Sequence, residues 1–421
     1  MRDYIIIIDM LIELPRHTEI FGSVKIHELQ RVLKLDSGGF ENPRACDIAF
    51  EGIKEVLKRL AIVVPIKDEN IHLLEGVLRA IPFDCTVIVV SNSARVPQDV
   101  YKMERDVITN VHNLTQQEML AIHQKDPELG FAFYELGYDH ILDSDRLVRD
   151  GKAEGMIVGM LLAKALGKDF VGFADADNYI PGSVREYVMD YAAGFCMSES
   201  PYSMVRLHWR YKPKVVEDRL YFKKWGRVSE TTNKYLNLLL STTTGFETRV
   251  VITGNAGEHA LTTKLADIMS YSTGYSIEPF HFVYLFDEFG LKAEKILYSD
   301  VVNAGIEVFQ IETLNPHIHE EKGEEHIKNM LLGSLSTIYN SKLCNDYVRQ
   351  KVLEELVDIL ESWEKPPEML IMPPIGDIDA IKFAKLLNTQ SETFLWLRQG
   401  VFEEKVDEES YLRNFKLGAF K

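Results

Sequence analysis

The sequence predicts an α/β fold in which a mainly parallel β-sheet is covered by helices. From about residue 50, short apolar runs typical of strands buried on both faces alternate with segments whose apolar residues have helical spacing. Polar residues follow each of these strands, as they do at the ligand-binding edge of an open parallel sheet. The chain has 421 residues, of which 46% are hydrophobic and 26% are charged. This composition is typical of a globular protein with one large domain or two ordinary ones.

Helices and strands are expected to alternate between residues 49 and 174. Each expected helix carries one apolar stripe, and each expected strand is a short apolar run. The expected helices are 49–60, 71–81, 101–111 and the amphipathic segment 152–166, and the expected strands are 61–65, 86–90, 120–122 and 170–174. The isoleucine-rich run at residues 5–8 predicts a further strand near the N-terminus.

The pattern changes after Gly194. Alternating apolar and polar residues at 204–210 and 219–225 predict antiparallel strands. A helix-rich region is expected from residue 320 to residue 363, and the proline-rich stretch 366–374 separates it from the last segment.

Charge and cysteine usage exclude several classes of protein. The formal net charge is −17, so we expect neither a nucleic acid nor an anionic membrane as partner, and any anionic substrate needs a local cluster of positive charge. The four cysteines are far apart and form no CxxC pair, which argues against a zinc ribbon or a thioredoxin-like site. No apolar stretch approaches the ~18 residues of a transmembrane helix, and the first apolar run is too short for a signal peptide. We therefore expect a cytoplasmic protein with reduced thiols.

The strongest chemical motif is Asp175-Ala-Asp177-Asn at the end of an expected buried strand. Two carboxylates two residues apart on extended backbone point the same way and can hold a hard divalent cation that also binds phosphate oxygens. An EF-hand loop is excluded, because Tyr179 and Ile180 would occupy a ligand position and the glycine position. A haloacid-dehalogenase-like phosphatase stays open as an alternative, although its DxD normally closes the first strand.

Three further segments have polar residues placed for chemistry. Lys152 begins an expected helix, where it can meet a diphosphate together with free backbone N–H groups. The turn 253–257 contains two glycines and can hold an anion on its backbone. His317 and His319 precede a long helix, and spacing alone does not join either of them to a metal site. Neither GxGxxG nor a P-loop motif is present, which argues against dinucleotide and P-loop nucleotide sites.

Nine segments together resemble the mannosyl-3-phosphoglycerate synthase family. They are AIVVPIKDEN at 61–70, VSNS at 90–93, IHQKDP at 122–127, GKAEG at 151–155, DADNYIPG at 175–182, VRLHWR at 205–210, YFKKWGRVSE at 221–230, TGNAGEHA at 253–260 and TLNPHIHE at 313–320. The likeness extends from about residue 19 to about residue 339 and is weaker beyond residue 363.

The resemblance implies a retaining GT-A glycosyltransferase that moves mannose from GDP-mannose to D-3-phosphoglycerate with a divalent metal (Mg, Mn or Co). The product would be the precursor of the compatible solute mannosylglycerate. A sugar-phosphate nucleotidyltransferase is an alternative, but it normally has a glycine-rich basic loop near the first strand, where only Lys67 stands. A non-catalytic sugar-nucleotide-binding protein is another, although two metal-binding carboxylates would serve no purpose in it. A homodimer is a possible assembly.

The resemblance also divides the chain and assigns the donor side of the site. Residues 1–60 would join the main domain, 61–265 would form the GT-A domain that binds nucleotide sugar and metal, and 266–421 would form an acceptor-side and helical C-terminal region. Asp175, Asp177 and Lys152 would be the catalytic residues. The metal would be held by Asp175, Asp177 and His317, with His319 as second candidate. The GDP pocket would be lined by Pro65, Lys67, Glu69, Ser91, Asn92, Gln124, Lys125, Lys152 and Asp175.

The acceptor is expected on the segment that follows the DxD motif. Three basic residues there alternate with apolar ones, so that on a strand the basic side chains would share one face. Arginine suits bidentate contacts with the phosphate of the acceptor, and the glycine turn offers backbone N–H groups. The expected acceptor-binding residues are Arg206, His208, Arg210, Arg227, Gly254, Asn255 and Ala256.

Overall fold

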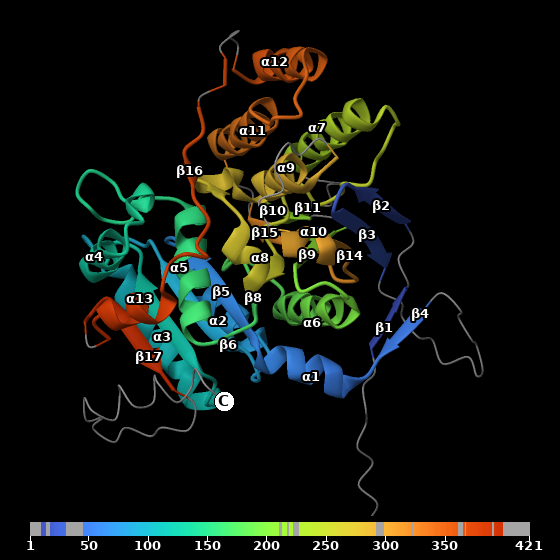
Figure 1. Cartoon of the computed structure of the whole chain (residues 1–421). Coiled ribbons are helices and arrows are strands. Elements are labelled where there is room, and N and C mark those ends of the chain that lie inside the picture. Colours follow the sequence, from blue (N-terminus) through green and yellow to red (C-terminus); the bar gives the residue numbers. More distant parts are fainter. Residues whose placement is uncertain are drawn as a thin grey trace, which may run out of the picture.

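A ten-stranded mixed sheet forms the centre of the computed structural model (Figure 1). The structure describes residues 10–13, 17–30, 45–209, 213–216, 219–221, 227–291, 299–320, 323–360, 365–366, 368–389 and 391–398. The strands are, in their order across the sheet, β17 (Phe394–Leu397), β7 (Met119–His123), β6 (Thr86–Ser91), β5 (Leu60–Ile66), β8 (Phe170–Phe173), β12 (His259–Thr262), β9 (Ser203–His208), β14 (Ile306–Glu312), β3 (Val24–Gln30) and β2 (His17–Phe21).

Most strands of this sheet run in one direction. β7, β6, β5, β8, β9, β14 and β3 are parallel to one another, whereas β17, β12 and β2 run the opposite way. The predicted α/β class with a mainly parallel sheet is therefore confirmed. Its strands come from all three of the ranges 1–60, 61–265 and 266–421.

Helices cover both faces of the sheet and enclose two apolar cores. Along β5 the side chains alternate between them, with Val63 in one core and Ile62 and Val64 in the other, so the apolar run of this strand is buried on both faces. The helices of the first core are α4 (Pro127–Glu135), α5 (Lys152–Ala165), α7 (Arg227–Thr244), α8 (Thr263–Ile268), α9 (Ile277–Phe289), α11 (Glu324–Tyr339), α12 (Asp346–Leu360) and α13 (Ala380–Leu386). Those of the second are α1 (Phe50–Lys58), α2 (Ile71–Ala80), α3 (Val100–Thr115) and α6 (Pro181–Met197).

Three small sheets, one short α-helix and the 3₁₀ helices η1 (Asp139–Ile141) and η2 (Gly274–Ser276) complete the described fold. β1 (Met10–Glu13) pairs with β4 (Ala45–Ile48), and β13 (Tyr271–Ser272) pairs with β16 (Ile371–Met372), both antiparallel. β10 (Lys214–Val216) and β11 (Arg219–Tyr221) form a hairpin, and β15 (His319–Glu320) lies parallel to β10. The short helix is α10 (Ser299–Ala304).

The predicted helices and strands between residues 49 and 174 are present, with one correction. The segment 152–166 is helical as α5, but every residue from Ala153 to Ala163 is buried, so the helix is not amphipathic. It packs so closely on β5 that a Cβ at Gly159 would lie 2.4 Å from Val63 Cγ1. A helix that is apolar on all sides is typical of the interior of a larger protein.

Three further strand predictions have mixed outcomes. The segment predicted at 204–210 is β9, which is antiparallel to β12 but parallel to β14, so its prediction as an antiparallel strand is only half right. The segment predicted at 219–225 is antiparallel as far as Tyr221, and residues 222–226 lie outside the described residues. The isoleucine run at 5–8 also lies outside them.

Strand direction brings the predicted motifs to one edge of the sheet. Loops that follow β5, β6, β7, β8, β9 and β14 all lie at the carboxyl ends of parallel strands. β12 runs the opposite way, so the glycine turn that precedes it lies at the same edge. The seven loops therefore surround one place, which is where ligands bind in open α/β sheets.

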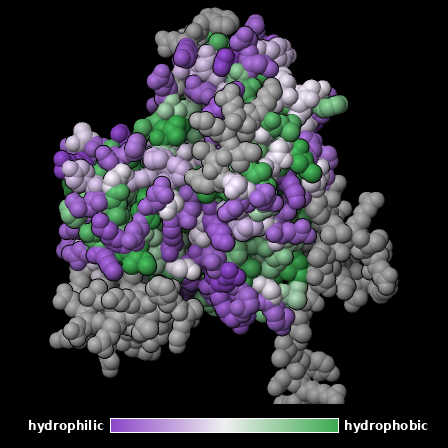
Figure 2. All heavy atoms as spheres, in the orientation of Figure 1, coloured by the Kyte–Doolittle hydropathy of each residue, from purple (hydrophilic) through white to green (hydrophobic). Residues whose placement is uncertain are grey.

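The surface is largely hydrophilic on the face shown in Figure 2, with apolar residues interspersed among the polar ones. Among the helices that the structure describes, none combines the length and the apolar character needed to cross a bilayer.

Candidate active site

Lys152 joins two carboxylates at the edge where the loops meet. Its Nζ lies 2.7 Å from Asp175 Oδ1 and 3.2 Å from Glu278 Oε1, and its side chain is 17% exposed. Lys152 is the first residue of α5, Asp175 follows β8, and Glu278 is in the first turn of α9. Burial alone would lower the pKa of Lys152, but Asp175 and Glu278 raise it well above its usual value. The lysine is therefore a fixed positive charge beside the first carboxylate of the DxD motif.

The glycine turn 253–257 lies directly against this ion pair. A Cβ at Gly257 would lie 2.8 Å from Asp175 Oδ2 and 2.9 Å from Lys152 Nζ, so any larger residue here would have to displace the ends of the two paired side chains. Behind the turn, His259 Nδ1 lies 3.0 Å from the carbonyl oxygens of Ala256 and Gly257. Burial lowers the pKa of His259 well below its usual value, so the ring is neutral and its Nδ1–H donates to those carbonyls.

Arg206 supports the same turn from inside the protein. It is fully buried, and its guanidinium donates to Thr253 O (2.8 Å and 3.1 Å), Gly254 O (3.3 Å) and Glu278 O (3.1 Å). Burial lowers its pKa to about 9, so it is still charged at neutral pH. The alternation of basic residues predicted a side chain that faces the acceptor. The structure corrects this prediction, because the donors of Arg206 are directed to backbone carbonyls beneath the turn.

The segment that carries His317 is attached to α6 and to the DxD loop. Glu186 of α6 accepts hydrogen bonds from Leu314 N (2.7 Å) and Asn315 N (2.9 Å). The Ser183 hydroxyl donates to Pro316 O (3.1 Å). Tyr179 N, just after the DxD motif, donates to Ile318 O at 3.0 Å. These bonds bring residues 314–318 to the end of β8, although about 140 residues separate them in sequence.

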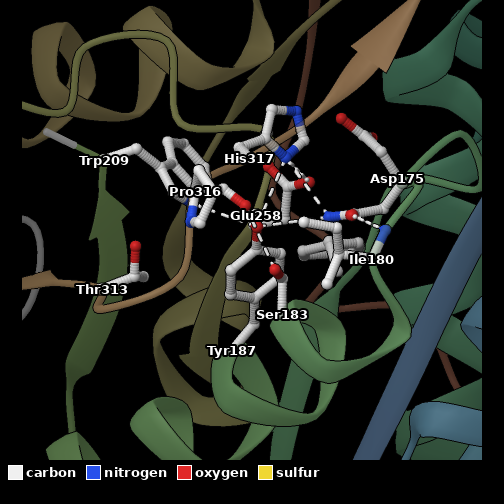
Figure 3. A network of polar contacts seen from close by, with 12 residues as sticks. Asp175, Ile180, Ser183, Tyr187, Trp209, Glu258, Thr313, Pro316 and His317 are labelled. Carbon is white, nitrogen blue, oxygen red and sulfur yellow. Dashed lines mark hydrogen bonds and ion pairs between the residues drawn. The ribbon is translucent and has the colours of Figure 1, made fainter. Parts of the chain in front are cut away.

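The His317 ring is enclosed by a polar network (Figure 3). Its Nδ1 lies 3.4 Å from Glu258 Oε1, 3.3 Å from Asn178 Nδ2 and 3.4 Å from Tyr187 Oη. The Trp209 ring lies over it with 4.9 Å between centroids, and Trp209 Nε1 donates to Tyr187 Oη at 3.1 Å. The ring of His319 lies 5.0 Å from that of His317. His317 is thus fixed in position next to the loop that carries Asp175 and Asp177.

The side chains at this place suit a divalent cation in chemical type. Asp175 and Asp177 are partly exposed, and His317 supplies an imidazole from the adjoining segment. Carboxylate and imidazole are ordinary ligands of such ions. Among the described residues, no three His, Cys, Asp or Glu side chains already form a complete ligand set.

The residues predicted for the nucleotide converge on the loop before α5. Asn92 Nδ2 donates to Asp150 Oδ1 (3.0 Å), and Gln124 Nε2 donates to Gly151 O (3.1 Å) and Arg149 O (2.5 Å). Lys125 Nζ donates to Val148 O (2.7 Å) and to Asp143 Oδ2 (3.1 Å). Side chains that were predicted to line the GDP pocket therefore also hold the loop that leads to Lys152.

The other four predicted nucleotide residues lie at the ends of β5 and β6. Lys67 is exposed, and Pro65 and Glu69 are partly buried. Ser91 is fully buried, and its Oγ accepts from Ser93 N at 3.2 Å, so this serine shapes the loop.

Several predicted acceptor residues line a narrow recess beside the turn. Its walls are Leu207, His208, Trp209, Ser229, Ile252, Thr253, Asn255 and Ala256. Two backbone N–H groups of the turn already have partners, because Gly254 N donates to Asn233 Oδ1 (2.7 Å) and Ala256 N to Thr253 O (3.1 Å). The expectation that these two groups bind an anion is therefore not met. Arg210 lies outside the described residues, and the side chain of Arg227 is not described.

Three residues of this site were not singled out from the sequence. Glu258 directly follows the glycine turn, and this position is the one feature of the sequence that points to it. Glu278 and Tyr187 have no such signal, because helices α9 and α6 bring them to the site only in the folded chain.

The sequence of this chain is similar to those of known proteins over most of its length. The family model described as mannosyl-3-phosphoglycerate synthase matches residues 14–387. The mannosyl-3-phosphoglycerate synthase of Pyrococcus furiosus is 53% identical over 390 residues, which cover 92% of this chain and 99% of that protein. The synthase of Aeropyrum pernix is 38% identical over 91% of this chain and 99% of its own length.

Among solved structures, the glucosyl-3-phosphoglycerate synthase of Mycobacterium tuberculosis, in complex with Mn²⁺, UDP and phosphoglyceric acid, is 17% identical with a TM-score of 0.46. The match covers 70% of this chain and 84% of that one. The assignment rests on the sequence relatives, whose similarity spans almost their whole length. The chain belongs to the mannosyl-3-phosphoglycerate synthase family of glycosyltransferases.

Proposed function

We propose that this chain transfers the mannosyl group of GDP-mannose to D-3-phosphoglycerate, with retention of the anomeric configuration and with a bound divalent metal ion. The observation that carries this proposal is that the predicted donor side and the predicted acceptor side of the site are in contact. Gly257, in the turn beside the acceptor recess, lies against Asp175 and Lys152 on the donor side. A donor diphosphate and an acceptor bound on either side of this contact would be neighbours.

The donor nucleotide would lie over the loops that follow β5, β6 and β7. Pro65, Lys67, Glu69, Asn92, Gln124 and Lys125 are the side chains proposed to surround it, with Ser91 as support from beneath. Lys152 would meet the diphosphate, because an ammonium has three N–H donors and its two carboxylate partners occupy only two of them. Its position at the N-terminus of α5 adds the favourable end of the helix dipole.

The metal would be held by Asp175, Asp177 and His317, with His319 as the second candidate for the histidine position. When bound, a divalent cation of this kind (Mg, Mn or Co) stabilises the negative charge that develops on a departing diphosphate. The attachment of the His317 segment to the DxD loop through Tyr179 supports this set.

The acceptor would bind at the mouth of the recess beside Trp209, which has His208, Asn255 and Ala256 in its walls. Arg206 would act from beneath by fixing the carbonyls of Thr253 and Gly254. Arg210 and Arg227 remain predicted contacts for the phosphate and carboxylate of the acceptor. Such basic groups are needed, because a trianionic acceptor must approach an anionic donor on a chain with a net charge of −17.

In the proposed reaction, the bond from the anomeric carbon to the β-phosphate oxygen breaks, and the acceptor hydroxyl oxygen bonds to that carbon on the same face of the sugar ring, as retention requires. The β-phosphate keeps the electron pair, and the hydroxyl proton is released. Lys152 would offset the charge on the departing GDP, and the Gly257 turn would keep donor and acceptor in contact.

Family membership favours glycosyl transfer over a nucleotidyltransferase, a phosphatase or a binding protein without catalysis. A cytoplasmic location and a homodimer remain predictions from the sequence.

The proposal is tested with the purified protein, GDP-mannose and Mg²⁺ or Mn²⁺, with and without 3-phosphoglycerate. We expect GDP release and a mannosylated phosphoglycerate only when the acceptor is present. Diphosphate release from GTP and mannose 1-phosphate would support a nucleotidyltransferase instead. Binding of GDP-mannose without turnover under any of these conditions would contradict the proposal.

A further inference from the structure

His123 lies between the two loops that follow β6 and β7, on which the nucleotide is proposed to bind. It is the last residue of β7, directly before Gln124 and Lys125, and it is paired in register with Ser91 at the end of β6. It is only 5% exposed. A ring nitrogen that is removed from water in this way needs a hydrogen-bond partner within the protein.

Both ring nitrogens of His123 have backbone partners, one in each loop. Nε2 lies 2.9 Å from the carbonyl oxygen of Ser93, in the loop after β6. Nδ1 lies 3.1 Å from the backbone N of Lys125, in the loop after β7. A carbonyl oxygen only accepts and a backbone N–H only donates, so Nε2 carries the proton and Nδ1 accepts. The ring is therefore neutral and connects the two loops through one defined tautomer.

The surroundings of His123 keep the ring neutral and in this orientation. Burial lowers the pKa of His123 below its usual value. Its backbone N donates to Thr393 O at 2.8 Å, and Tyr101 Oη donates to the same carbonyl oxygen at 2.8 Å. The Tyr101 ring meets the imidazole edge-on, with 5.1 Å between the two centroids. Helix α3 and strand β17 thus hold His123 from outside the site.

The two loops that the ring connects carry side chains assigned to the nucleotide pocket. Gln124 and Lys125 follow His123 in one loop, and Asn92 precedes Ser93 in the other. A ligand that contacts both loops binds more tightly when they are already held in place, because less conformational freedom is lost on binding. A side chain that ties the loops together therefore contributes to affinity.

We propose that His123 is a positioning residue for the donor nucleotide, because its imidazole joins the loops after β6 and β7 and so arranges Asn92, Gln124 and Lys125 for binding. Both of its nitrogens are used by the backbone, so it acts through these neighbours and not by contact with the nucleotide. The inference rests on the proposed function, since it concerns the pocket assigned there to GDP.

The test compares variants by calorimetric titration of the full-length protein with GDP. His123→Phe keeps an aromatic ring and removes both hydrogen bonds. One hydrogen bond contributes a factor of about two to ten, so we expect GDP to bind about ten-fold more weakly. The KM for GDP-mannose should rise by a similar factor while kcat is kept, which is the kinetic sign of lost binding. His123→Asn keeps an acceptor near the place of Nδ1, and His123→Gln keeps a donor near that of Nε2, so each should recover part of the loss.

His112→Phe is the matched control. His112 is also a buried histidine bonded to a backbone carbonyl, with its Nδ1 2.7 Å from Gln117 O, but it lies beside the opposite end of β7. Its replacement should lower the thermal midpoint without changing the affinity for GDP. Thermal unfolding of every variant shows that the affinities are those of folded protein.

Nitrogen NMR of protein labelled with ¹⁵N-histidine reports the tautomer directly. The signals of His123, identified by their absence from His123→Phe or, if that variant does not fold, from His123→Gln, should show a protonated Nε2 and an unprotonated Nδ1. A proton on Nδ1 would overturn the inference.

The binding data overturn the inference if His123→Phe binds GDP within two-fold of wild type, or if His112→Phe weakens GDP binding equally. If His123→Phe does not fold, wild-type affinity in both His123→Asn and His123→Gln overturns it. Failure of the wild-type protein to bind GDP is a different result, because it overturns the proposed function together with this inference.

Discussion

Replacing Lys152 by methionine tests the donor side of the site most directly. Methionine has a similar length, so the change removes the ammonium and leaves most of the packing of α5 in place. In the wild-type protein the ammonium lies 2.7 Å from Asp175 Oδ1 and 3.2 Å from Glu278 Oε1. Its pKa is raised well above the usual value, so the charge that is removed is present throughout the neutral range.

The contacts set the size of the expected effect. Two of the three N–H donors of Lys152 are used by Asp175 and Glu278, which leaves one for a phosphate oxygen. One charge-assisted hydrogen bond contributes about 1.5–3 kcal/mol, so GDP should bind roughly 10- to 150-fold more weakly. Removing one partner from a buried ion pair also costs about 3 kcal/mol of folding free energy. The variant should therefore be less stable and a poorer binder of GDP.

Calorimetric titration with GDP and thermal unfolding measure the two effects separately. Lys164→Met is the matched control, because Lys164 lies on the same helix with its Nζ 2.7 Å from Asp267 Oδ1, away from the catalytic edge. We expect the control to lose stability and to keep its affinity for GDP. If Lys152→Met bound GDP within two-fold of wild type, the proposed role of Lys152 would be wrong. Equal weakening by both variants would mean that the effect comes from helix stability.

Three further outcomes are expected. Asp177→Ala should stay folded and lose at least about ten-fold in kcat at saturating metal, a loss of about 1.4 kcal/mol in transition-state stabilisation. The wild-type enzyme should use 3-phosphoglycerate in strong preference to glycerate, and equal use of glycerate would contradict the acceptor assignment. Arg206→Ala should reduce this preference and lower the thermal midpoint, since it removes the buried guanidinium that donates to the carbonyls of Thr253, Gly254 and Glu278. Burial alone would raise the pKa of Glu307, but His27, Ser198 and two backbone N–H groups lower it to about 2. The stability that depends on this carboxylate is therefore present above its unfolded pKa of about 4.5 and is lost as the pH falls toward 2. Glu307→Gln should remove about 2 kcal/mol at pH 7, after allowance for solvent screening, and little at pH 2 in denaturant titrations.

The local pattern of the sequence was sufficient for four helices and four strands between residues 49 and 174. Apolar runs such as 61–65 and 86–90 could be recognised because a strand buried on both faces must be apolar at every position. The placement of Asp175, Asn92 and Gln124 after such strands was enough to predict that they share one edge of a sheet. That inference needs only the direction of the strands, which βαβ connections fix.

The role of Arg206 could not be predicted in the same way. Alternation along β9 shows which side chains share a face of the strand, but it does not show what covers that face. The turn 253–257 and the start of α9 cover it here, and they enclose the guanidinium completely. The helix α5 illustrates the same limit, because its expected polar face depends on what packs against it, and the described fold buries nearly all of it.

Family resemblance, rather than spacing, linked His317 to the DxD motif in the sequence. In the structure this link consists of Glu186, Ser183 and Tyr179 holding the backbone of residues 314–318. Glu258 and Glu278 join the site in the same way, through elements that are distant in the chain. The sequence by itself determined the strands, the helices and the residues at their ends, because these depend on local periodicity and on chain direction. Only the tertiary structure decided which of those residues are buried supports and which line the site, because burial depends on the elements packed around each side chain.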